Sequence, residues 1–204
     1  MNKIFAGLIF LLVKINLNLF GIPITIFPDF VAYIFIYFGL LELSVVTPMF
    51  KKSLKPAICL IFYNIVVGLL NLVPQVTYNG FSFSGAFKLV SGLATAYIFY
   101  IIILGLREYQ KKANVQIETS VLKKRWAAFT VTAIVSPFFK ALTYYDASVL
   151  NQLRDEQLRD VTYASVGFIA IAFIYGIICW IVLACFAAEF NKVRAVYNES
   201  RFAR

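Results

Sequence analysis

The chain has 204 residues, of which 61% are hydrophobic, and its mean hydropathy is +0.81. A soluble domain holds only about 45–50% apolar residues, so this composition excludes one and predicts an integral membrane protein. Histidine is absent, which removes the commonest general base and metal ligand. We therefore expect no enzyme activity, no metal site and no cofactor.

Six apolar segments are long enough, or nearly so, to cross a hydrocarbon core, which takes about 20 helical residues. They are residues 4–19, 28–44, 57–73, 87–106, 126–142 and 162–190. This pattern predicts an all-α, polytopic transmembrane bundle, with residues 1–204 forming a single integral membrane domain. The first segment carries Lys14, Asn16 and Asn18, so whether it crosses completely stays open.

The basic residues are unevenly divided between the two ends of these spans. If the spans alternate in direction, fourteen of the 19 lysines and arginines fall on the side of the termini and two within spans. The other side holds Lys88, Arg154 and Arg159. The positive-inside rule then places both termini in the cytoplasm. The net charge of +9 matches the anionic lipids of the inner leaflet, and we expect no nucleic-acid partner because the basic runs border spans.

A weak internal repeat links three of the spans. Tyr33-Ile34-Phe35 with a following Gly39 to Glu42 recurs as Tyr97-Ile98-Phe99 with Gly105 to Glu108. The last span has a looser counterpart in Tyr175 and Glu189. The repeat predicts three helical hairpins placed in the same orientation.

The first predicted hairpin carries a family resemblance. Asn16-Leu17-Asn18-Leu19, then Ile24 and Pro28-Asp29-Phe30 followed by Tyr33-Ile34, resembles the start of uncharacterised small multispanning membrane proteins of Gram-positive bacteria. Such proteins often have glycine before this tyrosine, where the chain has Ala32. The resemblance implies a location in a bacterial plasma membrane and a multispanning architecture, and it implies no activity.

The polar residues within the spans form a candidate intramembrane site. Lys14 falls about 15 Å along the first segment, where a charge requires a partner, and Asp29 is the nearest carboxylate in sequence, with Asn16 and Asn18 close by. Asp29 also follows Pro28 at a helix start, where a carboxylate complements the helix dipole. We weigh this structural role above a substrate or proton site.

Two further sets of polar residues have structural and functional interpretations. Asn64 and Asn71 share a face of the third span. They either form hydrogen bonds between helices or line a polar cavity. Three carboxylates, Glu42, Glu108 and Glu189, end spans on the cytoplasmic side. Because carboxylates are disfavoured at helix C-termini, we expect interface salt bridges with cations such as Lys51, Lys111 and Lys192. An acidic ring around a vestibule is the alternative.

Two functional classes follow from these observations. The first is a non-enzymatic membrane module that binds a partner protein, a lipid or an amphipathic compound, as accessory or immunity-like proteins do. The second is a small solute or proton-coupled transporter with a Lys14/Asp29 site. The sequence favours the first.

Overall fold

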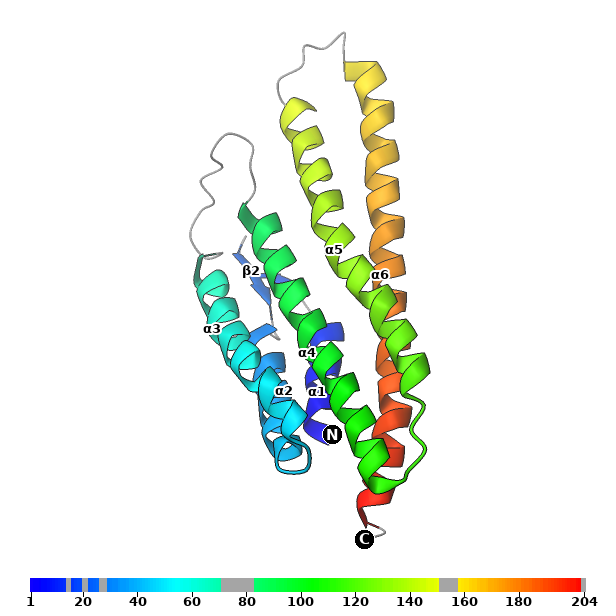
Figure 1. The fold of residues 1–204 in the computed structure, drawn as a ribbon. Helices are drawn as coiled ribbons and strands as arrows, with labels where there is room; N and C mark the ends of the chain where they lie inside the picture. Colours follow the sequence, from blue (N-terminus) through cyan, green and yellow to red (C-terminus); the bar gives the residue numbers. More distant parts are fainter. Residues whose placement is uncertain (14–15, 20–21, 26–28, 71–82, 151–157, 203–204) are drawn as a thin grey trace.

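The computed structural model describes residues 1–13, 16–19, 22–25, 29–70, 83–150 and 158–202, and these form a helical bundle (Figure 1). In chain order the α-helices are α1 (Asn2–Leu12), α2 (Asp29–Ser44), α3 (Leu54–Leu70), α4 (Phe83–Ala113), α5 (Thr119–Leu150) and α6 (Leu158–Phe202). A 3-10 helix, η1 (Pro48–Ser53), precedes α3. The predicted helical bundle is therefore confirmed.

The helices run along one common direction, and both termini lie at the same end of the bundle (Figure 1). The turn between α2 and η1 and the connection between α4 and α5 lie at this end too, and we call it the terminal end. Three stretches of the described residues are long and apolar enough to cross a membrane: Pro48–Leu69, Leu89–Ala113 and Phe173–Ser200. The chain is thus a membrane protein.

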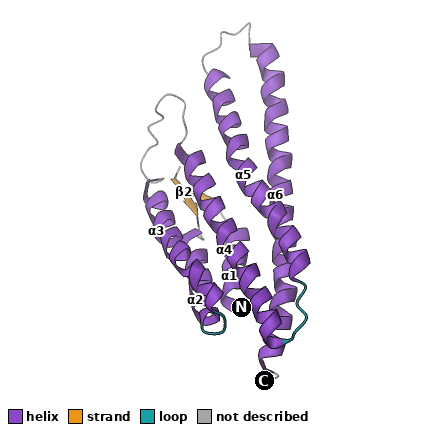
Figure 2. Ribbon diagram, viewed as in Figure 1, coloured by secondary structure: helices purple, strands orange, loops and turns teal. Residues whose placement is uncertain are grey.

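The predicted first helix, residues 4–19, is wrong in its second half. Helix α1 ends at Leu12, and β1 (Asn16–Leu19) pairs antiparallel with β2 (Ile22–Thr25), with Asn16 opposite Thr25 (Figure 2). The 11 residues of α1 extend only about 16 Å, half the thickness of a hydrocarbon core. The cause is local, because in Asn16-Leu17-Asn18-Leu19 polar and apolar residues alternate, which is the period of a strand.

The later helices extend beyond the predicted apolar segments. Helix α4 continues past residue 106 to Ala113, where Lys111 and Lys112 in its last turn complement the helix dipole. Asn114 follows with a φ of 53°, a left-handed conformation that ends helices and that asparagine tolerates. A polar helix end can project beyond a membrane, so hydropathy alone underestimates these lengths.

The predicted hairpins differ in how tightly they pack. Helix α1 packs along α2, and α5 packs along α6, as the repeat predicts. The middle pair is looser: α3 contacts α2 more extensively than α4, and α4 packs mainly on α5. Sequential neighbours therefore pack whether they are joined at the terminal end or at the opposite end.

An aromatic cluster joins the three longest helices. The ring of Phe99 on α4 packs edge-to-face against Phe186 and Phe190 of α6 and Phe129 of α5, with centroids 5.2, 6.2 and 6.4 Å apart. Phe129 and Phe186 stack on each other at 5.9 Å. Such pairs add about 0.5–1.5 kcal/mol each beyond the area they bury. This cluster, near the middle of the bundle, is the centre of the core.

Glycines set the distance between α1 and α2. A methyl group on Gly7 would lie 2.6 Å from the carbonyl oxygen of Ala32, and one on Gly39 would lie 2.9 Å from the backbone nitrogen of Ile4. Both obstacles are backbone atoms, which a rotamer change cannot move aside. The contact is therefore of the small-residue kind that lets membrane helices approach closely.

We expect Gly39→Ala to lower the stability of the bundle by about 1–3 kcal/mol, because the added methyl group forces α1 away from α2. Gly68→Ala is the matched control, since a methyl group there meets open space and alanine favours the helix by about 1 kcal/mol. Thermal unfolding in detergent, followed by the fluorescence of Trp126 and Trp180, measures both. Equal melting temperatures for the two variants would contradict the close contact.

Candidate functional site

A cluster of hydroxyl groups lies between α2 and α4. The hydroxyl of Tyr33 lies 2.6 Å from Oγ1 of Thr95 and 3.4 Å from Oγ of Ser91. Thr95 donates its own proton to the backbone carbonyl of Ser91 at 2.7 Å. Since a hydroxyl has one proton to give, Tyr33 must donate to Thr95. We call Tyr33, Ser91 and Thr95 the hydroxyl cluster.

The hydroxyl cluster is closed. Tyr33 and Thr95 are only 3% and 4% exposed, and their hydroxyls bond to each other and to the α4 backbone. Hydrogen bonds of this kind between membrane helices contribute about 0.6–2 kcal/mol each. The arrangement therefore holds α2 against α4 in a fixed register.

Asp29 lies at the edge of this cluster. It occupies the first turn of α2, where its charge complements the helix dipole, and its half-buried side chain is one helical turn before Tyr33. The structural role predicted for Asp29 at a helix start is therefore consistent with its position. Its predicted pairing with Lys14 stays a prediction, because Lys14 lies outside the described residues.

Of the other predicted intramembrane residues, Asn64 is the one whose side chain the structure describes. Asn16 and Asn18 belong to β1 instead of a spanning helix. The amide of Asn64 donates to the carbonyl of Leu60 on its own helix at 2.8 Å, which is a local bond. Asn71 lies outside the described residues, so the proposed shared role of Asn64 and Asn71 stays a prediction.

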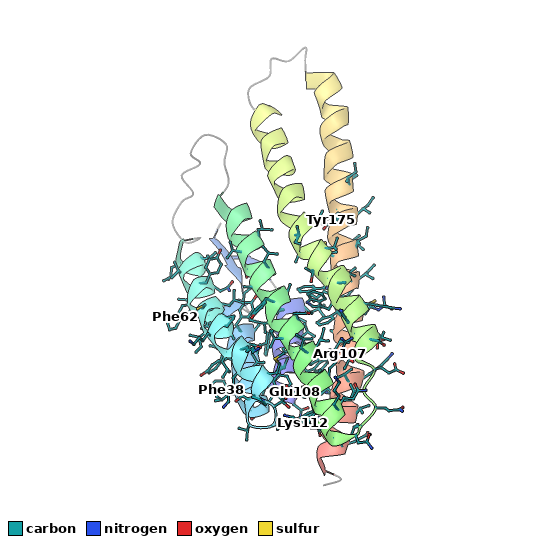
Figure 3. The ribbon with its side chains drawn as sticks, in the orientation of Figure 1. Phe38, Phe62, Arg107, Glu108, Lys112 and Tyr175 are labelled. Carbon is teal, nitrogen blue, oxygen red and sulfur yellow. The ribbon has the colours of Figure 1, made fainter. Side chains whose placement is uncertain are left out.

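Each of the three predicted carboxylates pairs with a cation at the terminal end. Glu42 on α2 pairs with Lys3 on α1 at 2.5 Å. Glu108 pairs with Lys112 at 2.8 Å, and Glu189 with Lys192 at 2.9 Å, each within its own helix. Figure 3 labels Glu108 and Lys112 near the terminal end of α4. The predicted salt bridges are confirmed, with Lys192 as expected.

Two of the carboxylates pair with lysines that were not named from the sequence. These are Lys3, which pairs with Glu42, and Lys112, which pairs with Glu108. Lys111 and Lys112 follow Glu108 by three and four residues, so both positions lie within one helical turn of it, and the pair forms with Lys112. The pair of Lys3 with Glu42 depends on the packing of α1 on α2, which no local pattern reveals.

The residues that make the interhelical polar contacts are not among those predicted from the sequence. Ser91 and Thr95 are four apart in an apolar span, and this spacing was the available signal for a polar face on α4. Trp126 of α5 donates to the carbonyl of Ala96 at 2.8 Å, and Tyr175 of α6 (labelled in Figure 3) donates to that of Thr132 at 3.1 Å. Among the described residues, no three acidic, cysteine or histidine side chains lie together as metal ligands would.

We expect Tyr33→Phe and Thr95→Val to be coupled by about 1 kcal/mol in a double-mutant cycle, because each removes one side of the same buried hydrogen bond. Tyr97→Phe is the matched control, since Tyr97 holds the equivalent place in the repeat but is exposed. Unfolding free energies come from denaturant titration in mixed micelles. Additive effects of Tyr33→Phe and Thr95→Val would show that the hydroxyl contact does not stabilise the bundle.

No family model matches the chain, and comparisons with curated proteins and with solved structures found no match. The residues and the geometry described above are therefore the basis for its function.

Proposed function

We propose that the chain is a non-enzymatic module of a bacterial plasma membrane, with both termini in the cytoplasm, that binds a partner protein, a lipid or an amphipathic compound. Accessory and immunity-like proteins act in this way. One observation carries the proposal: the surface is divided into apolar helix faces and a basic terminal end.

The apolar faces support insertion in a bilayer. Large side chains are exposed along three helices: Phe62, Val66 and Leu69 on α3, Val131 on α5, and Phe173 and Trp180 on α6. Phe173 is 70% exposed, and apolar surface in contact with water is unfavourable. Contact with lipid acyl chains removes this unfavourable hydration, so these faces support insertion in a bilayer.

The terminal end supports contact with an anionic leaflet. Lysines and arginines at this end are exposed, and they include Lys51, Lys52, Lys123, Lys124 and Arg125. The three carboxylates that end spans here already pair with other lysines. The excess positive charge therefore faces outward, where each basic residue near an anionic surface contributes about 1 kcal/mol.

The closed hydroxyl cluster favours a binding module over a transporter. Its buried hydroxyls bond to each other and to backbone, so they are engaged in holding α2 on α4. A substrate pathway through them would have to break these contacts at each cycle. We therefore assign the cluster to the scaffold.

We expect single cysteines at Val45 and Glu118, both exposed at the terminal end, to resist a membrane-impermeant maleimide in intact cells and to react after permeabilisation. A cysteine at Asn79, which lies outside the described residues in a loop predicted to be external, should react in intact cells. The background replaces the three native cysteines by alanine. Labelling of Val45 and Asn79 from the same side would overturn the proposed topology.

A transporter is the second candidate, and Asp29 is the observation that favours it. Its carboxylate is half-buried at the start of α2, one turn from the hydroxyl cluster. Carboxylates at such depths serve proton relays in other membrane proteins. The two candidates differ in whether this carboxylate moves protons or only stabilises the helix.

We expect the purified chain in proteoliposomes to leave proton entry at the level of empty vesicles when a diffusion potential is imposed. Asp29→Asn should then change only stability, by about 0.3–1 kcal/mol through the helix dipole, with Glu118→Gln as an exposed control. A pH-sensitive dye inside the vesicles reports proton entry. Entry that requires wild-type Asp29, in a variant that remains folded, would favour the transporter.

A further inference from the structure

The terminal ends of α1 and α6 form a polar contact. Asn198 of α6 donates its side-chain amide to Oδ1 of Asn2 at 2.9 Å. One turn deeper, the guanidinium of Arg194 lies over the ring of Phe5, 4.3 Å from its centroid. We call Asn2, Phe5, Arg194 and Asn198 the α1–α6 seam.

Arg194 carries a charge that the described part of the chain does not neutralise. Its Nε is buried and has no hydrogen-bond partner there, and no carboxylate pairs with its guanidinium. The acidic residues around it are engaged or exposed: Glu189 pairs with Lys192, Glu42 pairs with Lys3, and Glu199 is exposed. Protein atoms enclose this Nε, but Arg194 as a whole is half-buried, so its terminal nitrogens are the donors left for an anion from outside the chain.

The geometry of the seam selects the kind of anion. Because the ring of Phe5 covers one face of the guanidinium, the donors that remain are at its edge, in the planar fork that matches a phosphate or carboxylate. Asn2, three residues before Phe5, accepts from Asn198 through its Oδ1, so its own NH2 group adds neutral donors to the seam. The seam therefore presents donors and an aromatic surface to its ligand.

The position of the seam along the membrane normal indicates that the anion belongs to a lipid headgroup. Arg194 lies within the last two turns of the stretch Phe173–Ser200 that can cross a membrane, next to the exposed Asn191 and Lys192. In the topology proposed above, this level is where the inner-leaflet headgroups lie. We propose that the α1–α6 seam binds the phosphate of one anionic phospholipid, with Arg194 as its main ligand.

The test measures lipid binding to the full chain purified in a nonionic detergent, by native mass spectrometry. Phosphatidylglycerol is the anionic probe, phosphatidylcholine the zwitterionic one, and inorganic phosphate the soluble one. Arg194→Gln removes the charge and should lower the affinity for the first bound phosphatidylglycerol molecule by about tenfold. Arg125→Gln is the matched control, because Arg125 is an exposed arginine at the same end.

A second variant keeps the test decisive if Arg194→Gln fails to fold. Asn2→Asp preserves an oxygen acceptor for Asn198 at an exposed position and places a carboxylate against Asn198, which is one helical turn from Arg194. It should weaken phosphatidylglycerol to a similar extent, because the new charge pairs with the guanidinium and repels the lipid phosphate.

The outcomes separate this inference from the proposed function on which it rests. Unchanged phosphatidylglycerol binding in Arg194→Gln or in Asn2→Asp overturns the seam site, and so does equal binding of phosphatidylcholine. Displacement of the lipid by millimolar inorganic phosphate would make the ligand a soluble anion and overturn the lipid source. Failure of the proposed topology is measured independently by the cysteine labelling, which Arg194 does not affect.

Discussion

Close approach of helix backbones is the constraint on which the rest of this structure depends. In acyl chains the hydrophobic effect does not drive helices together, so association relies on contact geometry and on hydrogen bonds between helices. Gly7 and Gly39 bring α1 against the backbone of α2, and Gly105 receives the ring of Phe50 from η1. Phe99 then links α4 to α5 and α6 through its edge-to-face contacts. These packing contacts fix how the helices lie together, and the polar contacts form between helices that are already in place.

Two polar side chains inside the bundle, Tyr33 and Arg194, differ in whether they find a hydrogen-bond partner on another helix among the described residues. Tyr33 finds its acceptor on α4, so its hydroxyl is satisfied inside the protein and serves packing. Arg194 finds a ring but no acceptor for its Nε within the described residues. Because no carboxylate among the described residues neutralises Arg194, its terminal nitrogens are the donors assigned above to a lipid phosphate. This difference separates a structural contact from a candidate binding site.

The position of charge at the terminal end connects packing with membrane orientation. Lys3 and Glu42 join α1 to α2, while the pairs at Glu108 and Glu189 stay within single helices. Exposed pairs of this kind are worth only about 0–1 kcal/mol, so their effect on stability is small. Their larger effect is to neutralise the carboxylates, which leaves the remaining lysines and arginines to interact with an anionic surface.

The sequence by itself determined the membrane class, the helical bundle and the cation pairing of the three carboxylates, because hydropathy and helix-end electrostatics are local properties. The alternation of asparagine and leucine at residues 16–19 has the period of a strand, so the sequence also carried the signal for β1, which replaces the end of the first predicted helix. Only the tertiary structure decided that Tyr33 meets Thr95, that Lys3 reaches Glu42, and that Arg194 lies on Phe5 without an acceptor at its Nε. These contacts join residues 39 to 189 positions apart, so they depend on which helices pack against each other, and a local sequence pattern does not contain that information.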